Sequence, residues 1–300
     1  VDELEQAVRD LPTQPFGIGV SGKVRISLSG VQGKLAIVVE DDRFGLPEGL
    51  AASTHILKPS PRTAEGLERY PGIVTAEAMC MRVCHHLGLE VPDVNILELP
   101  TGPALLVKRY DRRHNSDGSV SRVHQEDLAQ ALGITSVQKY QEEGRDTPSL
   151  AGLVGVLEDV GAADLTTLGT VADRVTTFGL LTNCDAHAKN WSLLLLGAQV
   201  RLAPVYDVVP SAMWANIDTA LALRVGDCGL LEDFTVTNVR QEWQRWGLGV
   251  RALNPRLERL RAEVGDAVQA AGDDVVRMGG RADKVEQIAD LVTQRTKSFF

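Results

Sequence analysis

Apolar and polar positions divide the chain into two parts with different predicted secondary structure. In the first part, short apolar runs rich in β-forming residues alternate with turns that contain Gly or Pro, which is typical of strands. One longer segment, residues 74–89, is predicted to be a helix. The predicted strands occupy residues 23–29, 34–40, 54–59, 94–99 and 104–110.

The second part is dominated by segments whose apolar residues recur every three or four positions, which predicts helices. Polar stretches at residues 111–119 and 141–149 are predicted to be exposed loops. We therefore predict an α+β fold with a β-rich lobe at residues 1–108 and a helical lobe at residues 109–300. The predicted helices occupy residues 124–133, 150–160, 166–181 and 285–300.

Composition describes a globular chain that can bury a substantial core. Of its 300 residues, 44% are hydrophobic and 24% are charged, and the mean hydropathy is -0.06. The net charge of -9 argues against direct binding of nucleic acid, because that needs clustered Lys and Arg. No run approaches the roughly 18 apolar residues of a membrane span, and the first residues are acidic, unlike a secretory leader. These features predict a cytoplasmic protein that does not bind membranes.

The cysteines are predicted to be free thiols, because no C-x-x-C pair occurs and a chain of this size does not need disulfides. Cys80 and Cys84 lie four positions apart on the predicted helix, beside His85 and His86. This spacing could direct them to one metal ion. We interpret them instead as core residues, since free cysteines on a helix are usually buried.

A polar loop between two apolar runs has the most informative chemistry. It contains Asp185, His187, Lys189 and Asn190, and an apolar hairpin then leads to Asp207. Asp185 and Asn190 have the spacing of the D-x-x-x-x-N catalytic loop of protein kinases, in which the Asn binds magnesium, and Asp207 fits the second magnesium ligand. The alternative is a loop whose side chains only cap a helix and satisfy backbone groups.

Phosphoryl transfer explains why these residue types would occur together. The transferred group spreads negative charge over its oxygens, so the protein must supply positioned cations and a carboxylate. Mg²⁺ prefers hard oxygen ligands and keeps its waters. One carboxylate and one amide oxygen are therefore enough when ATP phosphates complete the shell.

The first part of the chain supplies two further candidates. Lys58 ends a predicted strand just before Pro59, where a lysine can point into a cleft as the ATP-binding lysine of kinases does. Glu77, on the following helix, could hold it. Alternatively, Lys58 is a solvated strand-end residue and Glu77 lies on a solvated helix face. The order Lys, Glu, Asp, Asn, Asp along the chain favours the site.

Two glycine-containing segments are candidates for a phosphate-binding loop. Residues 17–24 match G-x-G-x-x-G-x-V, but no convincing strand precedes them, so we interpret them as a flexible linker. Residues 27–34 follow a strand, and their backbone N–H groups could bind an anion. The predicted phosphate-binding residues of this loop are Gly30, Val31, Gln32 and Lys34, and its hydroxyls, Ser27 and Ser29, are possible phosphate acceptors.

Successive motifs over about residues 24–225 resemble those of HipA-type serine/threonine kinases, the toxins of HipBA toxin–antitoxin systems. The resemblance implies a bilobal, protein-kinase-like fold and transfer of the γ-phosphate of ATP to a protein hydroxyl. The motifs are RISLSGVQGKLA, THILKP, the Glu77 helix that ends in LGLEVPD, VKRYDRR, HQEDLAQALG with KY after it, LLTNCDAHAKNWSLLL and RLAPVYDVVPSA.

The resemblance also implies roles for the residues of the polar loop. Asp185 would be the catalytic base. His187 and Lys189 would lie near the γ-phosphate. Asn190 and Asp207 would bind Mg²⁺.

For the nucleotide, the resemblance implies that Lys58 contacts the phosphates and that backbone groups of Lys108 and Tyr110 meet the adenine at a hinge. Ser27 matches the serine whose autophosphorylation, in this family, expels the phosphate loop and silences the kinase. Ser29 stands where alanine is common, so the loop resembles the HipT-like branch with two possible sites.

Two departures from the family concern the loop and the length. Gly33 stands where an acidic residue is usual. Family members ordinarily carry about a hundred more residues before the loop, so either this part is trimmed or a separate small protein supplies it. The family implies neutralisation by a helix-turn-helix antitoxin of HipB type, DNA contact only through that antitoxin, and an aminoacyl-tRNA synthetase as target.

Three other functions have to be weighed. A small-molecule kinase of the aminoglycoside or choline type typically shows H-G-D, whereas Asn183 and Cys184 precede Asp185 here. A nucleotide-binding pseudokinase would have no reason to retain every charged residue of the site. A metallohydrolase built on Asp185, His187 and Asp207 would need a further ligand at metal spacing, and none is evident.

Overall fold

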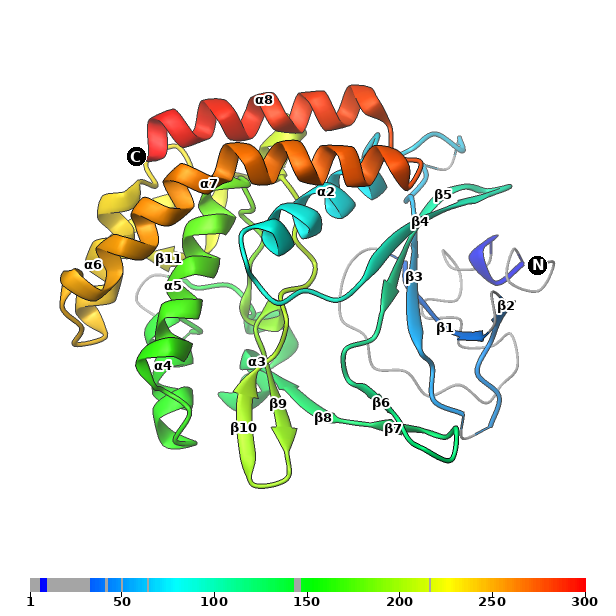
Figure 1. Cartoon of the computed structure of the whole chain (residues 1–300), viewed down its shortest axis with the longest axis horizontal. Coiled ribbons are helices and arrows are strands. Elements are labelled where there is room, and N and C mark those ends of the chain that lie inside the picture. Colours follow the sequence, from blue (N-terminus) through cyan, green and yellow to red (C-terminus); the bar gives the residue numbers. More distant parts are fainter. Residues whose placement is uncertain are drawn as a thin grey trace.

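A five-stranded antiparallel sheet forms the first part of the molecule (Figure 1). The computed structural model describes residues 6–9, 33–40, 43–49, 51–63, 65–142, 147–215 and 217–300. The strand order is β2-β1-β3-β5-β4. The strands are β1 (Leu35–Glu40), β2 (Arg43–Gly45), β3 (His55–Pro59), β4 (Val94–Leu99) and β5 (Gly102–Lys108).

Four of the five predicted strands are confirmed by β1, β3, β4 and β5, with ends that differ by no more than two residues. Their alternation of apolar runs with Gly and Pro turns was therefore a sufficient signal. The fifth predicted strand, residues 23–29, lies outside the described residues.

Helix α2 (Ile73–His86) confirms the predicted helix and is buried along most of its length. It packs against β4 and β5, and also against α7 (Val250–Arg277) and α8 (Ala282–Phe299) (Figure 1). The last two helices of the chain therefore cover a helix that follows β3. Cys80 and Cys84 are buried in this packing, as predicted for core residues.

The remaining helices and three small antiparallel sheets form the second part of the molecule. The helices are α3 (Leu128–Ala131), α4 (Leu150–Asp159), α5 (Leu165–Leu180) and α6 (Val236–Arg245), and the 3-10 turns are η2 (Ser136–Gln138), η3 (Ala188–Asn190) and η4 (Ser211–Met213). The strands are β6 (Arg112–His114), β7 (Val120–Arg122), β8 (His124–Asp127), β9 (Ser192–Leu196), β10 (Gln199–Leu202), β11 (Ala220–Val225) and β12 (Cys228–Leu230).

The predicted helix at residues 124–133 is only partly right. Residues His124–Asp127 form β8, which pairs with β9, and the short helix α3 begins afterwards. The Asp127 side chain accepts the Gln130 N–H at 2.9 Å and caps this helix. The pairing partner lies far along the chain, so the local apolar spacing could not reveal the strand.

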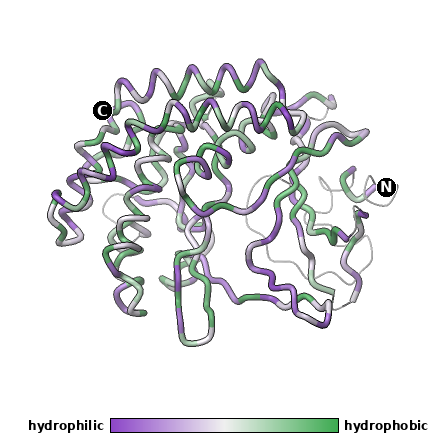
Figure 2. Tube along the Cα trace, in the orientation of Figure 1, coloured by the Kyte–Doolittle hydropathy of each residue, from purple (hydrophilic) through white to green (hydrophobic). Residues whose placement is uncertain are grey.

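The polar stretch at residues 111–119, predicted to be a loop, contains strand β6, which pairs with β7. Figure 2 shows this hairpin as mostly hydrophilic. No buried face marks its strands in the sequence, and strands without one give no alternation to detect.

The hydrophobic core does not divide at residue 108. The larger cluster of buried residues joins α2, β4 and β5 to the helices of the second part. A smaller cluster joins β1, β3 and β5 to residues 6–9. The predicted lobe boundary at residue 108 remains a prediction.

Among the described residues, no helix combines the length and the apolar composition needed to cross a bilayer.

We predict that Gly179→Ala destabilises the fold by about 1–3 kcal/mol, because it overpacks the core. Gly179 lies in α5, and an added Cβ would collide with the Phe234 ring and lie 3.0 Å from Cε2 of Phe299. Gly155→Ala in α4 is the matched control, since nothing lies within 4 Å of its added Cβ. That variant should gain about 0.5–1 kcal/mol from helix propensity. Urea unfolding measures both, and a Gly179→Ala chain as stable as the control would contradict the packing.

Candidate active site

Two lysines and two carboxylates from four segments meet in one cluster. Lys58, near the end of β3, pairs with Glu77 of α2 and donates to Oδ1 of Asp207 at 2.7 Å. Lys34, just before β1, donates to Oδ2 of Asp207 at 3.0 Å. Lys34, Lys58 and Glu77 are buried, whereas the Asp207 side chain is 23% exposed. The structure thus brings together residues that the sequence placed far apart.

Burial and charge oppose each other in this cluster. Burial disfavours the Lys58 ammonium, yet the carboxylates of Asp207 and Glu77 outweigh it and raise the pKa of Lys58. Burial also opposes ionised Asp207, but Lys34 and Lys58 outweigh it and hold the pKa of that carboxyl far below its ordinary value. For Lys34 and Glu77 burial prevails, lowering the pKa of the lysine and raising that of the glutamate.

The segment that carries Asp207 is bent and anchored to the polar loop. Asp207 has a φ of 61°, in the left-handed region that is uncommon for residues other than Gly. The preceding Tyr206 donates its hydroxyl hydrogen to the Lys189 carbonyl at 2.7 Å, and its oxygen lies 2.6 Å from Oγ of Ser192. Tyr206 therefore joins the two predicted metal-binding segments.

Backbone hydrogen bonds hold the polar loop that follows α5. The Cys184 N–H donates to Oγ of Ser211 at 3.1 Å, and its carbonyl accepts from Ala222 at 2.8 Å. The next residue, Asp185, is exposed. Nδ2 of Asn190 donates to the Asp185 carbonyl at 2.8 Å, which turns the amide Oδ1 of Asn190 away from that carbonyl. The loop thus presents a carboxylate and orients an amide oxygen.

His187 and Lys189 support this loop from within. His187 is only 4% exposed, and burial lowers the pKa of its imidazole, which therefore stays neutral. Among the described residues, Nδ1 of His187 has no hydrogen-bond partner. Lys189 is half-buried and contributes its carbonyl to Tyr206. The predicted nearness of both side chains to the γ-phosphate remains a prediction.

Tyr140 belongs to the site, although no role for it was predicted. Its hydroxyl donates to Oδ1 of Asp185 at 2.9 Å, and its ring meets His187 edge-on with 5.5 Å between centroids. The only signal in the sequence was its place in the KY pair of a family motif. A contact across 45 positions leaves no periodic pattern.

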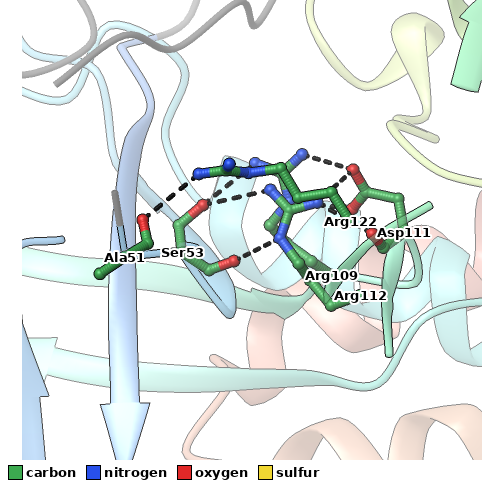
Figure 3. A network of polar contacts seen from close by, with 6 residues as sticks. All are labelled: Ala51, Ser53, Arg109, Asp111, Arg112 and Arg122. Carbon is green, nitrogen blue, oxygen red and sulfur yellow. Dashed lines mark hydrogen bonds and ion pairs between the residues drawn. The ribbon is translucent and has the colours of Figure 1, made fainter. Parts of the chain in front are cut away.

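An arginine network around Asp111 holds the segment after β5 (Figure 3). Arg109 donates to both carboxylate oxygens, at 2.9 and 2.6 Å, and Arg112 donates to Oδ2 at 2.7 Å. Arg112 also donates to the Ser53 carbonyl at 2.7 Å, which joins the segment to the start of β3. Burial disfavours the Asp111 carboxylate, but the two guanidinium groups outweigh it and lower its pKa.

The predicted adenine contacts lie on the same segment. The Lys108 N–H donates to the Asp93 carbonyl at 2.9 Å, so this donor is already used. The Tyr110 ring lies 5.8 Å from the Tyr206 ring, between centroids. Contact of these two residues with adenine remains a prediction that depends on their other backbone groups.

The structure describes only the end of the predicted phosphate loop. Of the predicted loop residues, Gly33 and Lys34 are described, and Ser27, Ser29, Gly30, Val31 and Gln32 lie outside the described residues.

Within the described ranges, no three His, Cys, Asp or Glu side chains cluster as metal ligands would.

A model of the HipA-like C-terminal domain family matches residues 26–295, so the chain belongs to this family. It is 32% identical over 235 residues to the serine/threonine-protein kinase toxin HipA of Shewanella oneidensis, and the aligned region covers 75% of this chain and 52% of that protein. It is 32% identical over 287 residues to "Putative kinase Y4mE" of Sinorhizobium fredii, covering 96% of this chain and 66% of that protein. The chain thus spans between half and two thirds of these curated relatives.

Solved structures share the fold. HipA in the Shewanella oneidensis complex of HipA, HipB and operator DNA matches with a TM-score of 0.80 and 26% identity, covering 99% of this chain and 70% of that one. The Helicobacter pylori proinflammatory kinase CtkA matches with a TM-score of 0.58 and 13% identity, covering 92% of this chain and 91% of that one. The predicted α+β, bilobal, protein-kinase-like fold is confirmed.

We predict that Asp111→Asn lowers the free energy of unfolding by about 3 kcal/mol, because two guanidinium groups lose their buried counter-charge. The pKa of Asp111 is lower in the folded than in the unfolded chain, so its carboxylate contributes stability above the unfolded pKa of about 3.9 and loses it as the pH falls toward the folded pKa. The difference from wild type should therefore shrink as the pH falls from about 5. Asp93→Asn is the control, because its pair with Lys108 is exposed and worth about 0–1 kcal/mol. Equal losses in urea unfolding would contradict this view of the network.

Proposed function

We propose that this member of the HipA-like C-terminal domain family is an ATP- and Mg²⁺-dependent serine/threonine protein kinase that acts as the toxin of a toxin–antitoxin system. One observation carries the proposal. The Asp207 carboxylate is flanked by Lys34 and Lys58 and is tied through Tyr206 to the loop that carries Asp185. Positioned cations beside a metal-binding carboxylate and an exposed base are what phosphoryl transfer needs.

The oxygen atoms of the site fit Mg²⁺. The Asp207 side chain keeps partial exposure, and the Asn190 amide nitrogen is occupied, so that its Oδ1 can serve a cation. Such hard oxygen ligands suit a magnesium ion that retains waters and takes further oxygens from phosphates. When bound, the ion would offset charge on the transferring group. We assign its binding to Asp207 and Asn190.

The remaining charged residues take the other parts of the reaction. Lys34 and Lys58 offer ammonium groups to the phosphates, and Glu77 holds Lys58 in place. Asp185 accepts the proton of the acceptor hydroxyl, since it is the exposed carboxylate of the loop. Each role uses a charge that the fold already positions.

The protein would limit its own activity through Ser27 and Ser29. A phosphate there adds about -1.5 to -2 charge to the loop that is proposed to bind the triphosphate. Repulsion between like charges would then expel either the loop or the nucleotide.

The proposed partners follow from the family. The Shewanella oneidensis HipA is found with HipB and operator DNA. By analogy, we infer a helix-turn-helix antitoxin of HipB type, with DNA contacted through it. The inferred target is an aminoacyl-tRNA synthetase.

We predict that Asp185→Ala and Asp207→Ala each slow phosphate transfer from labelled ATP by about a thousandfold or more, with the fold retained. Lys58→Ala should act chiefly by weakening ATP binding. The measurement is magnesium-dependent labelling of a host lysate and of the chain itself.

Mass spectrometry should find phosphate on Ser27 or Ser29 of the wild-type chain and none on the Asp185→Ala chain.

Asp233→Asn is the control for these variants, because Asp233 is an exposed carboxylate outside the site. It should transfer phosphate at the wild-type rate. Transfer at that rate by Asp185→Ala or Asp207→Ala would contradict the proposed kinase. Phosphate on the loop of the Asp185→Ala chain would show that another kinase modifies it.

We predict that expression of the chain without its antitoxin stops growth by blocking translation, and that Asp185→Ala removes this effect. Growth curves and incorporation of labelled amino acids measure both. Normal growth of cells that contain ATP-active wild-type chain would refute the toxin role and favour a metabolic kinase.

A further inference from the structure

A tyrosine hydroxyl is bonded to the carboxylate that we assign as the base. The OH of Tyr140 donates to Oδ1 of Asp185 at 2.9 Å. We propose that Tyr140 is a positioning residue that holds this carboxylate so that its other oxygen, Oδ2, accepts the proton of the acceptor hydroxyl. The proposal rests on the proposed kinase function.

The backbone on both sides of Tyr140 is fixed to the site. The Lys139 carbonyl accepts the Ala188 N–H of η3 at 3.0 Å. On the other side, the Gln141 N–H donates to the Ala222 carbonyl of β11 at 2.9 Å. The Ala222 N–H in turn donates to the Cys184 carbonyl, next to Asp185. The tyrosine and the aspartate are therefore anchored to the same backbone frame.

The ring of Tyr140 is also held, although the residue is 42% exposed. His187 meets it edge-on at 5.5 Å between centroids, and the Lys139 ammonium lies 4.9 Å from its centroid. These contacts limit the directions in which the hydroxyl can point. The bond to Asp185 thus follows from the packing of the ring.

The chemistry of the pair fixes which group donates. Burial and the Asp185 charge raise the pKa of Tyr140, so the phenol keeps its proton and donates it to the carboxylate. Among the described residues, Oδ2 of Asp185 has no hydrogen-bond partner. In the transfer step, the acceptor oxygen bonds to phosphorus, the bond from phosphorus to the leaving oxygen of ADP breaks, and the acceptor proton moves to Oδ2. The phenol proton stays on Tyr140.

Tyr140→Phe tests this role because it removes the hydroxyl and keeps the ring on His187. We expect kcat for transfer of labelled phosphate to casein to fall about tenfold, with the KM for ATP unchanged. Tyr70→Phe, at a tyrosine that packs on Trp214, is the control and should change neither quantity.

The fall in kcat can be attributed to the lost hydrogen bond because the substitution changes no neighbouring charge. The charged and titratable groups around the loop include Lys139, Cys184, His187, Lys189, Asp207, Asp218 and Arg295, and all of them remain in the variant. A kcat that rises or stays the same would overturn the proposal, since it would mean that the tyrosine competes with the acceptor or does nothing.

A second measurement does not depend on activity. Carbon-13 NMR of the Asp carboxyl groups, with the Asp185 signal assigned by its loss in Asp185→Asn, gives the chemical shift of this carboxylate in the wild type and in Tyr140→Phe. A changed chemical shift in the variant supports the bond, and an unchanged one refutes it. If the wild-type chain transfers no phosphate to casein, to a host lysate or to itself, the kinase function fails, while the Asp185 chemical shift still decides whether Tyr140 holds this carboxylate.

Discussion

The ion cluster of Lys34, Lys58, Glu77 and Asp207 is the constraint on which the site depends. Charges taken out of water are tolerated only when they are paired, and a pair that loses one member leaves an uncompensated charge. Because each member comes from a different segment, the cluster fixes β1, β3, α2 and the Asp207 turn relative to one another. The same ammonium groups that neutralise Asp207 in this arrangement are those that a triphosphate would attract. The stability of the fold and the chemistry of the site thus rest on the same charges.

Helix α2 holds its glutamate in place because the end of the chain holds α2. Nε of Arg82 donates to Oδ2 of Asp274 in α7 at 2.8 Å, and Nη1 of Arg259 donates to the Leu87 carbonyl, just after α2, at 3.0 Å. In many protein kinases, movement of the corresponding helix decides whether the lysine and glutamate pair forms. Here such movement would break contacts with both α7 and α8. Control of the site by displacement of α2 would therefore cost these contacts.

The sequence could predict the charged residues of the site because each stands where secondary structure changes. Lys58 ends a strand and Asp185 interrupts two apolar runs, so their positions could be recognised without a structure. Tyr140 could not be recognised, since its partner lies on a distant loop and its own segment has no periodicity. His124–Asp127 was misassigned for the same reason, because strand pairing depends on residues far along the chain. Local chemistry was predictable here, whereas contacts between distant segments were not.

Lys34 connects the predicted phosphate loop to the Asp207 carboxylate, the proposed magnesium ligand. It is the last residue of the loop segment 27–34, and it donates to Oδ2 of Asp207 while Lys58 donates to Oδ1. If phosphorylation drew this residue away, Asp207 would keep one ammonium partner instead of two. A carboxylate with less compensation has a higher pKa and a less fixed orientation. Displacement of the loop would therefore disturb the proposed magnesium ligand as well as the proposed phosphate contacts, so one modification would act on both halves of the proposed nucleotide site.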